Sequence, residues 1–226
     1  VVYKDHPHDR LEFVTPDIQP NDIVMFGSFY AINPVIRPQM QAFLEYAHQK
    51  GAILYYDVNY RASHKNEVVK VTANILENFE LADIIRGSSE DFEVMFNKTD
   101  ADSVYRAQID FYCKNFIYTQ GGAPIEFRAK GGLAKQYAVP DTKTVSTIGA
   151  GDNFNAGFVY GLIKYGVTRE MLEEGVAEDV WNSVISEANQ FAANVCTSIN
   201  NSIDMEFAEK KQQELEKVLK EMEENN

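Results

Sequence analysis

The sequence predicts an α/β protein built on a doubly wound, mostly parallel sheet with flanking helices. Short apolar runs alternate with helical patterns over residues 22–119. A glycine-turn hairpin follows, and the remainder is almost wholly helical. Alternation of this kind indicates parallel strands joined by crossover helices on both faces of the sheet. The length of 226 residues suits one large α/β unit, so we expect a single domain over residues 1–226.

The first half of the chain supplies the parallel strands. "DIVMFG" and "AILYYDV" are apolar runs of strand length, and "ADIIR" and "NFIYT" repeat the pattern. The strands are therefore expected at 22–27, 52–58, 82–86 and 115–119, with helices at 35–49, 68–79, 88–96 and 102–113. Of these helices, 88–96 opens with a serine cap followed by acidic residues, which suits the helix dipole.

The second half of the chain changes character. "PIEFRA" (124–129) and "LAKQYAV" (133–139) flank "KGG", which predicts a β-hairpin. Helices are expected at 151–165, 169–175, 177–199 and 204–224. In the last helix an apolar stripe recurs at helical spacing, formed by Leu215, Val218, Leu219 and Met222.

Composition narrows the class of protein. The net charge of −13 argues against non-specific nucleic-acid binding, which needs a cationic face. A few backbone amides can still build a local anion site inside an acidic protein. No stretch is apolar enough over sufficient length to cross a membrane. Cys113 and Cys196 form no metal-ligand pattern and are typical of small buried residues in a cytoplasmic protein.

The segment "STIGAGDNFNAGFVYG" (146–161) carries the clearest chemistry. Gly149 and Gly151 allow close approach of the backbone to a ligand, and a helix beginning there aims free N–H groups at whatever lies in front. Asp152 would then stand beside an anion site. Phosphoryl transfer needs amides for the developing charge and a base for the attacking hydroxyl. An ordinary helix start with an acidic first turn explains the tetrapeptide "GAGD" equally well by itself.

Its context resembles a known family. "TVSTIGAGDNFNAGFVYGL" is similar to the C-terminal signature of the ribokinase family of sugar kinases, also called the PfkB family. The resemblance implies a ribokinase-like fold, ATP as phosphoryl donor and a sugar as acceptor. It also implies that Asp152 is the catalytic base and contacts the sugar, and that the amides of Gly149, Ala150 and Gly151 form the anion hole.

Two further segments carry the resemblance. "YYDVNYR" (55–61) is similar to the family's D-x-N-x-R stretch, and "YTQGG" (118–122) to the strand and turn that touch the nucleotide phosphates. The implied nucleotide contacts are Asn59, Arg61, Thr119, Gln120, Gly121 and Gly122, with a structural role open for Asp57. Strand ends of an open α/β sheet are where ligands bind. Without the resemblance, an exposed loop and a plain Gly-Gly turn would explain these residues.

"RGSSED" (86–91) departs from the family pattern N-x-x-E, which helps to place Mg²⁺. The alignment puts Ser88 at the Asn position and Asp91 at the Glu position. A shorter carboxylate can still hold a water of Mg²⁺, because that ion usually keeps several waters. Asp91 is therefore the candidate metal residue, Glu90 the second choice, and a plain helix cap the alternative.

The resemblance begins partway into the family pattern. Tyr3 and Lys4 fall where the family runs a strand past the sugar, so Lys4 is a candidate substrate contact. The small lid domain over the sugar has no counterpart in this chain, and we expect the chain by itself to be poorly active, since lid closure excludes water. An uncovered sheet edge favours association, so a homodimer is one assembly that the sequence leaves open.

Three functions are compatible with these observations to different degrees. The first is an ATP-dependent kinase with a sugar substrate; fructose and 2-keto-3-deoxy sugar acids are the family-level choices. The second is a catalytically inactive nucleotide-binding fragment or regulator on the same fold. A dinucleotide-binding oxidoreductase is disfavoured, because no G-x-G-x-x-G follows a first strand.

Overall fold

The computed structural model describes residues 14–224, which form two compact units. Unit 1 comprises the described residues up to Gln136 together with Leu172–Glu174. Unit 2 comprises Tyr137–Met171 and the described residues from Gly175 onward. The expectation of a single domain stays a prediction.

Unit 1 is built on a six-stranded sheet in the order β1-β2-β3-β4-β5-β6. The strands are β1 (Ile23–Gly27), β2 (Ile53–Asp57), β3 (Ile84–Ser88), β4 (Asn115–Gln120), β5 (Ala123–Ala129) and β6 (Leu133–Tyr137). Strands β1 to β4 are parallel, and β5 turns back antiparallel to β4. The predicted α/β fold with a mostly parallel sheet and an edge hairpin is confirmed. Strand β1 forms the edge of the sheet opposite the hairpin. That the protein forms a homodimer stays a prediction.

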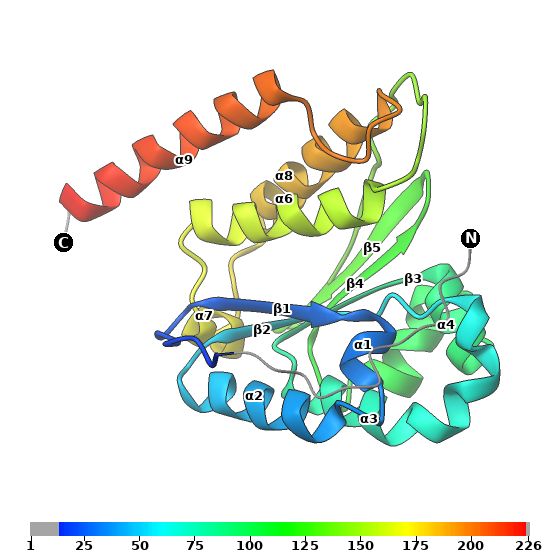
Figure 1. Cartoon of the computed structure of the whole chain (residues 1–226). Coiled ribbons are helices and arrows are strands. Elements are labelled where there is room, and N and C mark those ends of the chain that lie inside the picture. The colour runs from blue at the N-terminus through cyan, green and yellow to red at the C-terminus, as the bar shows by residue number, and fades with distance from the viewer. Residues whose placement is uncertain (1–13, 225–226) are drawn as a thin grey trace. The chain divides into compact units, whose positions relative to one another are not determined.

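The helical segments of unit 1 connect these strands. They are α1 (Ser28–Ile32), α2 (Arg37–Gln49), the 3₁₀ helix η1 (Ala62–Glu67), α3 (Val68–Leu81), α4 (Ser89–Phe96), α5 (Ala101–Val104) and the π-helix η2 (Tyr105–Ile109). Figure 1 shows α1, α2 and α3 on the same side of β1 and β2, as expected for right-handed crossovers between strands in sequential order. Their apolar faces meet Leu54, Tyr56 and Phe116 in one core cluster.

Two sequence expectations need correction in unit 1. The helix expected over 102–113 is interrupted, because α5 passes directly into the wider turn η2, where the Asp110 amide bonds to Tyr105 O at 2.8 Å. This turn accompanies a stack of Tyr105 on Phe116, with ring centroids 5.9 Å apart. The sequence did not predict α1 or η1, because each is too short to show a repeating apolar pattern. Cys113 is buried as expected, whereas Cys196 in unit 2 is only partly so.

Unit 2 contains the long helices α6 (Ala150–Lys164), α8 (Glu178–Cys196) and α9 (Met205–Glu224). The residues of α7 (Arg169–Glu174) are divided between the two units. Helices α6 and α8 approach closely at Gly157. A Cβ added there would lie 2.8 Å from the Cα of Ala188, so only glycine fits this packing. Along the described chain, no helix is long and apolar enough to cross a membrane.

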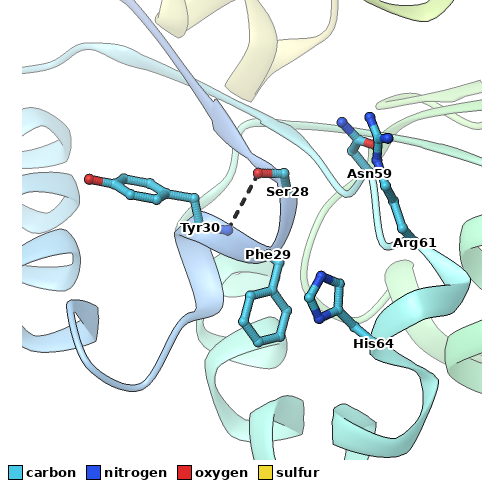
Figure 2. Close-up of a pocket in the computed structure, with 6 residues that line it drawn as sticks. All are labelled: Ser28, Phe29, Tyr30, Asn59, Arg61 and His64. Carbon is cyan, nitrogen blue, oxygen red and sulfur yellow. Dashed lines mark hydrogen bonds between the residues drawn. The ribbon is translucent and has the colours of Figure 1, made fainter. Parts of the chain in front are cut away.

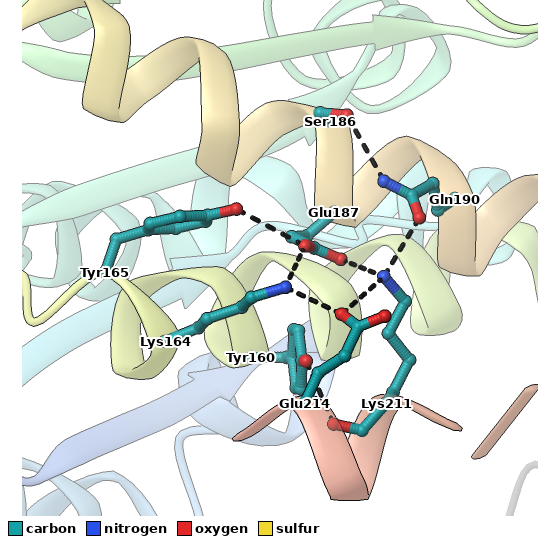
Figure 3. A network of polar contacts seen from close by, with 8 residues as sticks. All are labelled: Tyr160, Lys164, Tyr165, Ser186, Glu187, Gln190, Lys211 and Glu214. Carbon is teal, nitrogen blue, oxygen red and sulfur yellow. Dashed lines mark hydrogen bonds and ion pairs between the residues drawn. The ribbon is translucent and has the colours of Figure 1, made fainter. Parts of the chain in front are cut away.

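A polar network ties α9 to α6 and α8 (Figure 3). The Glu187 carboxylate of α8 accepts from Lys164 Nζ of α6 at 2.8 Å and from Lys211 Nζ of α9 at 2.6 Å. Glu214 Oε2 completes the network, 2.7 Å from Lys164. Lys211 and Glu187 are almost fully buried, at 5% and 3% exposure. Burial alone would lower the pKa of Lys164, but the hydrogen bonds to Glu187 and Glu214 raise it above the ordinary value.

Candidate functional site

Polar side chains meet at the carboxyl ends of three neighbouring parallel strands in unit 1. Arg86 of β3 donates from Nη1 to Asp57 Oδ1 of β2 at 2.9 Å, and from Nη2 to Thr119 Oγ1 of β4 at 2.9 Å. Asp57 and Arg86 are both buried. The ion pair supports the structural role that the sequence left open for Asp57. Sequence reasoning missed Arg86, because the pattern "ADIIR" marks it only as the last residue of a strand.

Beside these strand ends lies a pocket of about 310 Å³ (Figure 2). Its lining residues are Ser28, Phe29, Tyr30, Asn59, Arg61 and His64. The structure therefore brings together Asn59 and Arg61, which were both predicted as ligand residues. Ser28, Phe29 and Tyr30 were missed, although "SFY" directly follows the strand predicted at 22–27 and so falls at the same edge of the sheet. His64 was also missed.

Local backbone geometry shapes this pocket. Ser28 and Asn59 both adopt positive φ, +56° and +38°, at the points where β1 and β2 end. Such conformations are uncommon outside glycine and often occur at ligand sites. His64 is held by a near-parallel stack on Phe29, with centroids 3.9 Å apart, and by Glu67 Oε1 at 3.2 Å from Nδ1. Among the described residues that line the pocket, Arg61 brings a guanidinium and none brings a carboxylate, which suits an anionic group.

Asp91 forms the start of α4. Its Oδ2 accepts from the Ser88 amide at 2.6 Å, while the Asp91 amide donates to Ser88 Oγ at 3.2 Å, which is a capping box. Its Oδ1 accepts from the Tyr60 amide at 2.7 Å. Burial raises the pKa of Asp91, and the bonds from Ser88 oppose that shift. The helix-cap alternative is therefore what the geometry displays. A metal role would have to use the lone pairs that these bonds leave over.

The turn between β4 and β5 holds the remaining predicted nucleotide contacts. Gln120 pairs with Ala123 across a turn made by Gly121 and Gly122. Gly121 has φ +62°, and a Cβ placed on either glycine would meet nothing within 4 Å. The backbone of this turn is therefore open to a ligand.

In unit 2 the predicted glycine turn begins helix α6. Gly149 is the N-cap residue with φ +83°, and a Cβ there would lie 2.7 Å from Asn201 O. The Asn153 amide bonds to Gly149 O at 2.9 Å, and the Ala150 amide bonds to Thr147 O at 3.2 Å. The amides of Gly151 and Asp152 are left as first-turn donors without a helical acceptor. Asp152 is exposed beside them.

Not every predicted site residue can be placed with the others. Lys4 lies outside the described residues. Asn59, Arg61 and Gly121 belong to unit 1, whereas Gly149–Gly151 and Asp152 belong to unit 2. A cleft shared by these two groups stays a prediction. Among the described residues, no three His, Cys, Asp or Glu side chains gather as a metal cluster.

Comparison with known proteins gives one consistent family. The sequence profile "pfkB family carbohydrate kinase" matches residues 3–206. A 5-dehydro-2-deoxygluconokinase of Geobacillus thermodenitrificans is 26% identical over 194 residues, covering 78% of this chain and 55% of that protein. The enzyme of the same name from Bacillus thuringiensis is 24% identical over 151 residues, covering 65% and 45%. The chain thus spans about half the length of these curated relatives.

Solved structures agree on the fold. Aminoimidazole riboside kinase from Salmonella enterica, complexed with aminoimidazole riboside and an ATP analogue, superposes with a TM-score of 0.70 at 20% identity. That match covers 88% of this chain and 64% of the kinase. Fructokinase from Vibrio cholerae, with fructose, ADP and calcium bound, gives a TM-score of 0.69 at 19% identity, covering 82% and 58%.

Proposed function

Because the chain belongs to the pfkB family of carbohydrate kinases, we propose that it is the nucleotide-binding and catalytic part of an ATP-dependent sugar kinase. The observation that carries the proposal is the start of α6. There the Gly149 turn leaves first-turn amides without helical acceptors beside the exposed carboxylate of Asp152. An anion site next to a base is what transfer of a phosphoryl group to a hydroxyl requires.

In this proposal the backbone amides and the Asp152 side chain at the start of α6 have separate roles. Amides of Gly149–Gly151 hold the oxygens of the γ-phosphoryl group, helped by the positive end of the helix dipole. Asp152 accepts the proton of the attacking sugar hydroxyl. The Ala150 amide already donates to Thr147 O, so it is the weakest donor candidate of the three.

Unit 1 supplies the nucleotide contacts. The Arg61 guanidinium and the Asn59 side chain line one pocket and would bind phosphate oxygens, for which a bidentate guanidinium is well suited. Gln120 and Thr119, with the open backbone of Gly121 and Gly122, would contact the rest of the polyphosphate.

Mg²⁺ would accompany the nucleotide, where it neutralises charge on the phosphates. This ion is usually bound through one or two carboxylates, several waters and the phosphates themselves. Asp91 fits such a role only as an acceptor for a metal-bound water, because both of its oxygens already take protein hydrogen bonds. Glu90, on the same first turn of α4, remains the second choice.

The acceptor would be a sugar or a sugar acid. The curated relatives phosphorylate 5-dehydro-2-deoxygluconate by name, and the structural neighbours include a fructokinase. A panel of 5-dehydro-2-deoxygluconate, fructose and 2-keto-3-deoxygluconate therefore tests the substrate class.

The proposal is tested by measuring ATP binding by calorimetry and phosphoryl transfer by a coupled assay, with Mg²⁺ present. Asp152→Asn keeps the size of the side chain but removes the base. We expect kcat to fall about 10²–10⁴-fold, the usual range for a general base, with little change in ATP affinity. Near-normal turnover in Asp152→Asn, or loss of its ATP binding, would show that the assigned role is mistaken.

A chain that binds ATP and transfers nothing to any sugar would favour the second function instead, a nucleotide-binding regulator on the kinase fold. The same assay is then repeated on a longer protein that covers the full family length. Activity in that protein would show that only the present chain is inactive, and no activity would show that the whole protein is inactive. Absence of ATP binding in both would refute the kinase proposal.

A further inference from the structure

Arg86 occupies a central position that the proposed kinase roles do not use. It lies near the end of β3, between β2 and β4, and its side chain is only 10% exposed. One guanidinium nitrogen reaches Asp57 and another reaches Thr119, each at 2.9 Å. The segments that follow β2 and β4 carry the predicted phosphate contacts. Arg86 therefore connects the carboxyl ends of β2 and β4, from which the two predicted phosphate-binding segments continue.

The contact with Thr119 fixes the direction of a proton. A guanidinium has only donors, so the Thr119 hydroxyl must accept from Arg86 and keeps its own proton to donate. Among the described residues that hydroxyl donates to Gly87 O over a long 3.5 Å. An anionic oxygen beyond the strand end would be a stronger acceptor.

The contact with Asp57 fixes a charge. Asp57 is buried and lies two residues before Asn59, at the base of the pocket segment. A carboxylate there would repel phosphate groups if it were uncompensated, and the repulsion would be strong because burial reduces screening. Arg86 supplies the opposite charge at hydrogen-bond distance. The buried pair thus presents no net charge to a ligand.

We propose that Arg86 is a positioning residue for the nucleotide phosphates, which orients the Thr119 hydroxyl toward them and neutralises Asp57. The inference rests on the proposed function, since it deepens the nucleotide site of unit 1. Arg86 itself touches no phosphate in this proposal and acts through its two partners.

The test is titration of the whole chain with ATP, ADP and adenosine in Mg²⁺ buffer, using single variants and their combinations. Arg86→Lys replaces the fork by a single ammonium, which cannot hold both partners. Thr119→Val removes only the hydroxyl. Asp57→Asn combined with Arg86→Met removes the pair without leaving a buried charge. Arg106→Met, at an exposed arginine of η2, is the matched control.

We expect Arg86→Lys and Thr119→Val each to weaken ATP binding by about tenfold, the loss typical of one hydrogen bond to a charged group. Adenosine affinity should not change, because adenosine carries no phosphate. Combining the two substitutions should weaken ATP little further, since both act through one hydroxyl. The pair-removed variant should bind ATP better than Arg86→Met alone.

Equal losses for ATP and adenosine would assign Arg86 a purely structural role and overturn the inference. So would unchanged ATP binding in Arg86→Lys and Thr119→Val, both checked as folded by circular dichroism. If the Arg86 variants unfold, Thr119→Val alone decides by the same criterion. Failure of the wild-type chain and of a full-length parent to bind ATP would instead overturn the proposed function, and this inference with it.

Discussion

Replacing Lys211 by methionine should destabilise unit 2 through the polar network of Figure 3. The substitution keeps the apolar stem and removes a buried ammonium that lies 2.6 Å from Glu187 Oε2. Breaking a buried ion pair from one side costs about 3–5 kcal/mol. Glu187 keeps its second partner, Lys164, at 2.8 Å, so we expect the lower part of that range or slightly less, about 2–3 kcal/mol.

Urea unfolding followed by tryptophan fluorescence is the suitable assay. The chain has one tryptophan, Trp181, which is fully buried in α8 and therefore reports on unit 2. Lys217→Met is the matched control on the same helix, since that side chain is 78% exposed, and its effect should stay within about 0.5 kcal/mol. Adding Glu187→Gln to Lys211→Met leaves Lys164 and Glu214 as one pair of opposite charges and no uncompensated carboxylate. The double variant should therefore regain about 1 kcal/mol of the free energy of unfolding that Lys211→Met loses.

The reasoning is refuted if Lys211→Met costs no more than Lys217→Met. It is also refuted if the loss in the double variant equals the sum of the two single losses, because that result would show no coupling between Lys211 and Glu187.

Two further predictions concern the same unit. Gly157→Ala should lower its free energy of unfolding by about 1–3 kcal/mol in urea, because the new Cβ collides with the backbone of Ala188; a gain of stability would show that the helices separate at no cost. Its control is Ala156→Gly on the exposed face of α6, which should cost about 1 kcal/mol through helix propensity alone. The hydrogen bond from Lys164 lowers the pKa of Glu214 below its ordinary 4.5, so its stabilisation is complete above that pH and is lost as pH falls through the folded-state pKa. Melting temperatures measured across this acid range should drop less steeply in Glu214→Gln, and identical slopes would contradict the assignment.

Much of unit 1 could be predicted from local pattern. The apolar runs located β1, β2 and β4 within about one residue, because buried parallel strands are nearly continuous in hydrophobicity. Asn59 and Arg61 were predicted as ligand residues from the family resemblance together with the rule that ligands bind at carboxyl strand ends. Both line the pocket, and their ligand role stays a prediction. These features depend on neighbours along the chain, which a sequence shows directly.

The missed features depend on distant contacts. Phe29 and His64 are 35 positions apart in sequence, and only the folded chain stacks their rings. The Arg86–Asp57 pair joins two strands across 29 positions, which no spacing rule connects. The positive φ at Ser28, in the turn from β1 into α1, is a local feature, and it was missed because the residue there is not a glycine.

Asp91 has a consequence for how this protein can evolve. One carboxylate caps α4 through Ser88 and also tethers the loop after β2 through the Tyr60 amide. A glutamate would push its carboxylate one methylene further, so it could not keep both attachments in place without movement of the Tyr60 loop. Substitution at this position is therefore constrained twice, by a helix and by a loop. Sequence drift should proceed here only through paired changes at two positions that are 31 residues apart.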